Sequence, residues 1–186
     1  MGATLPWSIN PLQGQAAYSR DRNMDPIGKS PVPTPVLILA KLAMAGCLLF
    51  FLLKPHVTDS LLYDPTPTQS IGAFLAALGV LLVISGFVCL GKSVSVGLPE
   101  GKTELKTSGI FHITRNPLYL GGFLACAGSC LSCPHFVNMI LCVLTIAIHH
   151  RIIQKEEDFL EARFGEQWLD YKRRVPRYLG MIRHSG

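Results

Sequence analysis

The sequence predicts an all-α integral membrane protein with four transmembrane helices and a C-terminal amphipathic helix. Of its 186 residues, 49% are hydrophobic and 16% are charged, which is too apolar for an ordinary soluble domain of this size. The apolar residues are also clustered: residues 36–53 contain one charged side chain in 18 residues, and residues 71–90 contain none in 20. About 20 helical residues cross a hydrocarbon core of about 30 Å, so each segment matches a transmembrane helix.

A third apolar segment, residues 118–148, has 31 residues without Asp, Glu, Lys or Arg. One straight helix of that length would be about 46 Å long, and Pro134 would remove a backbone donor in its middle. We therefore expect a helical hairpin that turns near Pro134. One kinked helix, which would give three crossings in total, is the alternative.

The ends of the chain differ from this apolar middle. Residues 1–35 are polar and rich in proline, which predicts a flexible cytosolic leader rather than a cleavable signal peptide. Residues 36–180 then form the membrane domain. After the hairpin the helix is expected to continue through charged residues until Gly165 caps it, and a second, amphipathic helix is expected over 166–174, ending before Pro176.

Basic residues are distributed unevenly among the polar segments. The 54–69 loop has one Lys against Asp59 and Asp64, whereas Lys and Arg are frequent before the first span, after the second and after the hairpin. The positive-inside tendency then places both termini and the 91–117 loop in the cytosol. This arrangement needs an even number of spans, and four fits. The net charge of +5 reflects this topology and anionic headgroups rather than nucleic acid.

The six cysteines lie in or beside the apolar segments. Cys126, Cys130 and Cys133 have helical spacing, but no His or carboxylate flanks them in a metal-ligand pattern. We expect buried thiols, and predict neither a disulfide nor a metal site.

The hairpin would bring residues 115–119 back beside residues 151–157 at one membrane face. Ionisable groups at that depth are costly without partners or a ligand, so they predict a functional site. Two plainer interpretations are open: Arg115 and Glu156 neutralise each other, and Asn116-Pro117 is an N-capping turn. In the tail, Arg173, Arg174 and Arg177 are expected to contact lipid headgroups.

Three motifs together carry a family resemblance. They are the turn Arg115-Asn116-Pro117-Leu118-Tyr119, the pair Glu156-Glu157, and an ending with the pattern F-G-x-x-W-x-x-Y-x-x-R-V-P that starts at Phe164. Over about half the chain, residues 90–178, this combination resembles the isoprenylcysteine carboxyl methyltransferase family and its phospholipid methyltransferase relatives. Each motif alone would be weak.

The resemblance implies a cofactor, S-adenosylmethionine, held at the cytosolic membrane edge. The positions that it assigns to the cofactor are Thr103, Glu104, Leu105, Lys106, Phe111, Asn116, Pro117, Leu118, Tyr119 and Glu156. The positions that it assigns to catalysis are Arg115, Arg151 and Glu157.

The chain also departs from the family pattern. Phe111 stands where Tyr is frequent, and Asn116 stands where His is frequent. The Arg that contacts substrate in some members falls on Ile152, and a shift of one residue to Arg151 turns a helical side chain by about 100°. Arg151 is therefore a candidate rather than an equivalent.

The implied activity is formation of a carboxyl methyl ester on a C-terminal isoprenylcysteine. Its α-carboxyl, with an ordinary pKa of about 3.5, is ionised at neutral pH and needs no base, while an Arg would orient it. A phospholipid amine is the near alternative, and would need a base such as Glu157. The E-L-x-T-S-G stretch and the R-V-P ending favour the isoprenylcysteine branch.

Two further interpretations are weighed against this one. Membrane sterol reductases, which use a nicotinamide cofactor, share a similar turn and tail but are generally longer. An inactive membrane-binding homologue would explain the altered His and Arg positions. The resemblance implies prenylated protein C-termini or a lipid as acceptor, no nucleic-acid partner, and the endoplasmic reticulum membrane, with a bacterial inner membrane as the alternative.

Overall fold

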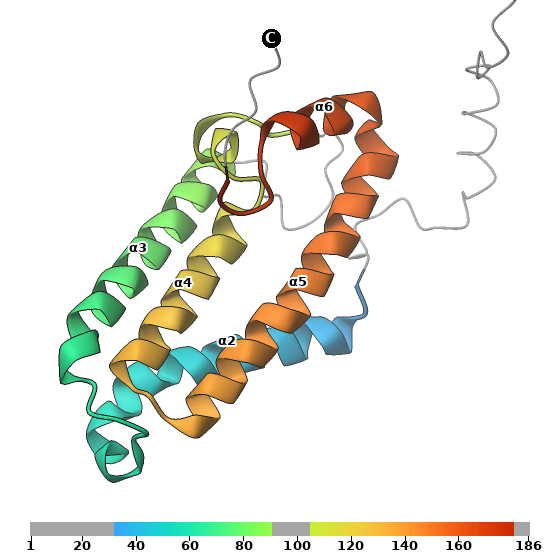
Figure 1. Cartoon of the computed structure of the whole chain (residues 1–186). Helices are drawn as coiled ribbons and strands as arrows, with labels where there is room; N and C mark the ends of the chain where they lie inside the picture. The colour runs from blue at the N-terminus through green and yellow to red at the C-terminus, as the bar shows by residue number, and fades with distance from the viewer. Residues whose placement is uncertain (1–31, 91–104, 181–186) are drawn as a thin grey trace, which may run out of the picture.

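The computed structural model describes residues 32–90 and 105–180, and these residues are helical without any strand (Figure 1). Most of the predicted leader, and Thr103 and Glu104, lie outside them. The described helices are α2 (Thr34–Leu53), α3 (Thr66–Leu90), α4 (Pro117–Ser132), α5 (Phe136–Phe164) and α6 (Glu166–Arg174), with short 3-10 turns η1 (Lys54–His56), η2 (Thr58–Ser60) and η4 (Gly109–His112).

Three of these helices are long and apolar enough to cross a membrane. They are α2 with its continuation to His56, at 23 residues, α3, at 25 residues, and α5, at 29 residues. The chain breaks between α4 and α5 at residues 133–135, as Pro134 predicts. With 16 residues, α4 is a shorter apolar helix, so the four-span topology stays a prediction.

The helices form a layered bundle. α3, α4 and α5 lie next to one another in Figure 1, and α2 crosses the lower parts of α4 and α5 and packs on both. The 54–65 loop and the turn at 133–135 lie at one end of the bundle. The segment before α4, α6 and the residues that follow α6 gather at the other.

Glycines hold α3 and α4 together. Gly72 and Gly79 of α3 are buried against α4. A Cβ built on Gly79 would lie 2.4 Å from the carbonyl oxygen of Gly121, and one built on Gly128 would lie 2.4 Å from that of Gly72. The two backbones are therefore too close for any side chain at these points, which is a common way for helices to associate in lipid.

Gly165 ends α5 and turns the chain into α6, as the sequence predicts. Its φ of 53° favours glycine, and its amide donates to the carbonyl oxygen of Glu161 at 2.9 Å. Within α6, Trp168 and Tyr171 are buried and pack with Val175, while Leu105, Leu160 and Phe164 lie against this cluster. The buried face of α6 thus covers the protein itself, and its predicted role at the membrane surface stays untested.

Candidate functional site

The start of α4 is held by the chain that follows α6. The amide of Arg115 donates to the carbonyl oxygen of Pro176 at 3.0 Å, and the Thr114 hydroxyl donates to that of Arg177 at 3.1 Å. The Asn116 side-chain amide also donates to the Arg177 carbonyl, at 3.3 Å. Pro117 then begins α4, since its fixed φ suits a first helical position and its missing donor is not needed there.

The buried carboxylate of Glu157 is the shared partner of several polar side chains at this end of the bundle. Only 3% of Glu157 is exposed. Arg177 donates to both of its oxygens, Nε to Oε1 at 3.1 Å and Nη2 to Oε2 at 2.7 Å, and the Asn116 amide donates to Oε1 at 3.3 Å. Nη1 of Arg115 lies 3.6 Å from Oε2. A buried charge needs this degree of pairing, so the cluster fixes α5 against the start of α4 and the C-terminal segment.

The two arginines around Glu157 differ. The hydrogen bonds that Arg177 donates to Glu157 raise the pKa of Arg177 above its ordinary value. Burial lowers the pKa of Arg115, and the nearby Glu157 carboxylate opposes that shift. The Arg115 guanidinium lies over the Trp168 ring at 5.6 Å, and its Nε and Nη1 are buried without a hydrogen-bond partner among the described residues. Arg115 therefore keeps donor capacity for a ligand.

Beside this cluster, the Tyr119 hydroxyl donates to Oε1 of Glu156 at 2.9 Å. The Tyr119 ring lies 5.7 Å from that of His149, whose ring is 6.2 Å from Phe123, and Phe123 in turn lies 5.7 Å from Tyr178. Nδ1 of His149 donates to the carbonyl oxygen of Thr145 at 2.8 Å, because a carbonyl can only accept. The site therefore combines two adjacent carboxylates, Glu156 and Glu157, with an aromatic wall beside them.

The structure thus brings together five of the predicted residues: Arg115, Asn116, Tyr119, Glu156 and Glu157. The suggestion that Arg115 and Glu156 neutralise each other was wrong, because Arg115 is paired with Glu157 and Glu156 is bonded to Tyr119. Adjacent carboxylates on one helix point about 100° apart, and this rotation separates their partners.

The other predicted residues lie farther from this group. Pro117 and Leu118 lie against α3, where a Cβ on Gly86 would be 3.1 Å from Leu118 Cγ. Phe111 is buried, and its carbonyl oxygen accepts from the Tyr171 hydroxyl at 2.6 Å. Leu105 packs against the Trp168 cluster, and Lys106 is half-buried.

Arg151 stays outside the group. It is exposed on α5, while Ile152 beside it is buried with Ala40 of α2. No hydrogen bond or ion pair links Arg151 to the site within the part of the chain that the structure describes. Its catalytic role stays a prediction.

Two participants were missed. Arg177, expected at lipid headgroups, instead pairs with Glu157, and His149 lies next to Tyr119. The position of Arg177 directly after the R-V-P ending was the available signal, because the helix ends before Pro176 and Arg177 therefore does not share a helix face with Arg173 and Arg174. His149 gave no signal beyond its place near a helix end.

Comparisons with known proteins identify the family of the chain. The phospholipid methyltransferase family matches residues 68–167, more than half of the chain. A protein-S-isoprenylcysteine O-methyltransferase of Schizosaccharomyces pombe is 30% identical over 141 residues, which cover 74% of this chain and 57% of the relative. Enzymes of the same name from Rattus norvegicus and Mus musculus are each 32% identical over 122 residues, covering 59% of this chain and 43% of each relative. The chain therefore spans about half the length of these relatives. No solved structure matches it.

Proposed function

The chain belongs to the phospholipid methyltransferase family, and we propose that it is a membrane methyltransferase that uses S-adenosylmethionine to form the carboxyl methyl ester of a C-terminal isoprenylcysteine. Three relatives carry the name of that activity. One observation carries the proposal: Tyr119 bonds Glu156 and Asn116 bonds Glu157, which joins the turn motif to the Glu pair at one end of the bundle.

The chemistry of these residues fits the cofactor. Tyr119 engages one oxygen of Glu156, so the second oxygen can accept from the cofactor's ammonium group or a ribose hydroxyl. The rings of Tyr119, Phe123 and His149 offer π faces, which attract a cation within about 6 Å. A sulfonium is such a cation. Pro117 and Leu118 would contribute through their backbone, since their side chains contact α3.

We extend the cofactor site to the segment before α4. Phe111 and the stretch Thr103, Glu104, Leu105 and Lys106 would close one side of it. Leu105 and Phe111 are held by the Trp168 and Tyr171 cluster, which gives this wall a rigid support.

The bound cofactor supplies an electrophilic methyl group, so the chain has only to orient the acceptor and exclude water. An isoprenylcysteine carboxylate is already ionised at neutral pH. A phospholipid ammonium would need a base, but both oxygens of Glu157 are engaged by Arg177 and Asn116. Glu157 is better suited to positioning than to proton transfer, and this favours the carboxylate acceptor.

Two arginines are candidates for orienting that carboxylate. Two buried nitrogen atoms of Arg115 make no hydrogen bond among the described residues, although Nη1 forms an ion pair with Glu157, and a guanidinium can bind a carboxylate through paired hydrogen bonds. Arg151 is exposed on α5, on the outside of the bundle. We assign Arg115 to binding the acceptor carboxylate within the site. We assign Arg151 to contacting the acceptor as it approaches the site from outside the bundle.

We further propose that α4 completes a four-span topology, with both termini and the site on the cytosolic face of the endoplasmic reticulum membrane. The basic residues that follow α5 support this orientation through the positive-inside tendency. The expected acceptors are prenylated protein C-termini, which the lipid-embedded helices would meet within the bilayer.

The direct test is methyl transfer from labelled S-adenosylmethionine by the purified full chain in lipid, with N-acetyl-farnesylcysteine and phosphatidylethanolamine offered in parallel. We expect base-labile label on the first acceptor. Label on the phospholipid alone would show that the acceptor is a phospholipid, and absence of both transfer and cofactor binding would overturn the proposal.

The variant Arg151→Ala should raise the KM for the acceptor and leave cofactor affinity unchanged. The control is Arg163→Ala, a change at another exposed arginine of α5.

A further inference from the structure

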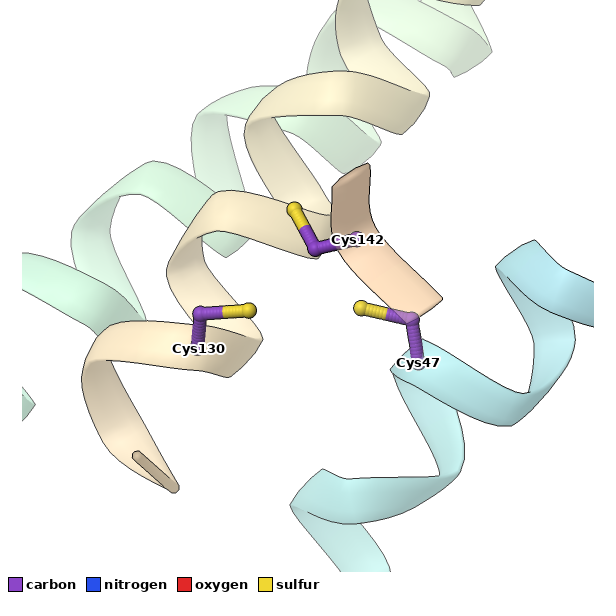
Figure 2. Close-up of side chains that lie close together, drawn as sticks. All are labelled: Cys47, Cys130 and Cys142. Carbon is purple, nitrogen blue, oxygen red and sulfur yellow. The ribbon is translucent and has the colours of Figure 1, made fainter. Parts of the chain in front are cut away.

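Three cysteines from three helices meet inside the bundle. Cys47 of α2, Cys130 of α4 and Cys142 of α5 have Sγ atoms that all lie within 4.8 Å of one another, and all three are free thiols. In Figure 2, the sulfur atoms of Cys47 and Cys130 point toward each other, and the Cys142 sulfur completes a triangle with them. Cys47 and Cys142 are distant from Cys130 in sequence. The spacing of cysteines along the chain therefore did not predict this three-cysteine cluster.

This triangle has nearly the size of a three-coordinate metal site. A metal–thiolate bond is about 2.3 Å long, so three sulfur atoms around a central ion are separated by about 4.0 Å. The observed upper limit of 4.8 Å requires movements of only a few tenths of an ångström on each side. Side-chain rotation alone can supply such shifts.

Unpaired polar atoms flank the same place. Oδ1 of Asn138 and Oγ1 of Thr145 are buried without a hydrogen-bond partner among the described residues. They lie four residues before and three residues after Cys142, which places them on the same face of α5 one turn away on either side. A buried polar atom without a partner costs about 1–3 kcal/mol. The Asn138 amide nitrogen is paired, since it donates to Ser129 Oγ at 3.2 Å and to the carbonyl oxygen of Cys133 at 3.0 Å, so the two oxygens mark a polar section of α5 beside Cys142.

We propose that Cys47, Cys130 and Cys142 bind one Cu(I) ion. An all-sulfur donor set selects a soft metal. Coordination number then decides between ions, because Zn(II) is almost always held by four ligands and this triangle offers three sulfur atoms, a number that suits Cu(I). Each cysteine that binds as a thiolate releases its thiol proton to the solvent.

This site is separate from the proposed methyltransferase site and does not depend on it. Cys142 and Glu156 are 14 residues apart on α5, about 21 Å along the helix axis. The bound ion would cross-link α2, α4 and α5 and stabilise their arrangement in proportion to its affinity, as any ligand specific for the folded state does. α3 contributes no ligand, so its contact with α4 would be unaffected.

The test uses the full chain in lipid nanodiscs, with ascorbate to keep copper monovalent. Cu(I) is titrated in competition with the chelator bicinchoninate, and we expect one ion per chain. Cys47→Ala, Cys130→Ala and Cys142→Ala should each weaken binding at least tenfold. Cys133→Ala is the matched control, because Cys133 is as buried as Cys47 but lies outside the triangle, and the variant should bind as the wild type does.

A second measurement needs no variant. Maleimide labelling of the unsubstituted chain, mapped by mass spectrometry, should show that Cu(I) protects Cys47, Cys130 and Cys142 and leaves Cys89 as reactive as before. Undiminished Cu(I) binding by the three single variants, an equal loss in Cys133→Ala, or protection of a different set of cysteines would each overturn the site. Tighter binding of Zn(II) than of Cu(I) would overturn the choice of metal.

Discussion

The α3–α4 interface and the Glu157 cluster hold helices together by opposite means. At their closest points α3 and α4 carry glycines, which have no side chain. A Cβ on Gly79 or on Gly121 would lie 2.4 Å from a carbonyl oxygen of the other helix. Around Glu157 the side chains are long and charged, and they join α5 to the start of α4 and to the segment after α6.

The two regions therefore fail in different ways. A glycine interface is damaged by adding an atom, because the neighbour is backbone and cannot move aside. A buried ion cluster is damaged by removing a charge, because the remaining charges stay buried without a counterion. The first region determines how closely two helices approach, and the second determines which groups face the candidate site.

The largest effect should come from Glu157→Gln. This change keeps the shape but leaves Arg115 buried without a counterion, and loss of one partner of a buried pair costs about 3–5 kcal/mol. The measurement is the free energy of unfolding in detergent micelles. Glu161→Gln is the control, because its ion pair with Lys172 is exposed and should contribute at most about 1 kcal/mol. Equal losses in both variants would show that the cluster around Glu157 does not hold the bundle.

The glycine interface should respond next. Gly79→Ala places a methyl group 2.4 Å from a backbone oxygen, so we expect a loss of about 1–3 kcal/mol in the same assay. Gly46→Ala is the matched control in α2, where the new Cβ would meet only the end of the Leu141 side chain at 3.2 Å. It should be neutral or stabilising, since alanine favours helix more than glycine does. A tolerant Gly79→Ala would contradict the close packing of α3 on α4.

A functional effect of moderate size should follow from Tyr119→Phe. The change removes the hydroxyl that orients Glu156 and keeps the ring against His149. We expect affinity for S-adenosylmethionine to fall about tenfold, or about 1.4 kcal/mol, with little change in stability. Isothermal titration of the full chain in lipid measures this, and Tyr63→Phe, an exposed position in the 54–65 loop, is the control. Unchanged affinity would remove Tyr119 and Glu156 from the cofactor site.

The smallest effect concerns an exposed carboxylate, which contrasts with buried Glu157. Hydrogen bonds from the hydroxyl and amide of Thr66 lower the pKa of Asp64 below its ordinary value of 3.8. A lowered folded-state pKa stabilises the protein above the unfolded-state pKa, and this contribution is lost as pH falls through the folded-state pKa. Thermal midpoints of the wild type should thus exceed those of Asp64→Asn at pH 7, and the difference should shrink as the pH falls below 3.8. A difference between the wild type and Asp64→Asn that stays constant with pH would contradict the assigned bonds.

Much of the fold follows from local signals in the sequence. Apolar length predicted the long helices, Pro134 predicted the break before α5, and Gly165 predicted the end of that helix. These signals act within a few residues, so they need no knowledge of the rest of the chain. The glycine contacts between α3 and α4 were not predicted, because a small residue has no partner until two helices are placed side by side.

The candidate site was predictable only in part for the same reason. The sequence was sufficient to place residues 115–119 beside residues 151–157, but it did not predict the individual pairs Tyr119–Glu156 and Asn116–Glu157. The position of Arg177 depends on the turn at Gly165 and on the packing of Trp168, which are tertiary features. The cysteine triangle likewise requires three helices to be placed in register.

The short length of α4 has a consequence for access to the site. Its 16 residues rise about 24 Å, about 6 Å less than a typical hydrocarbon core. In the proposed four-span topology, α4 is thus shorter than the hydrocarbon core, which is a hydrophobic mismatch. Local thinning of the bilayer around the N-terminal end of α4, next to Asn116, relieves this mismatch. A lipid-anchored acceptor would then reach the site by a two-dimensional search within its own leaflet, while a water-soluble cofactor would enter through the dimple in the membrane surface.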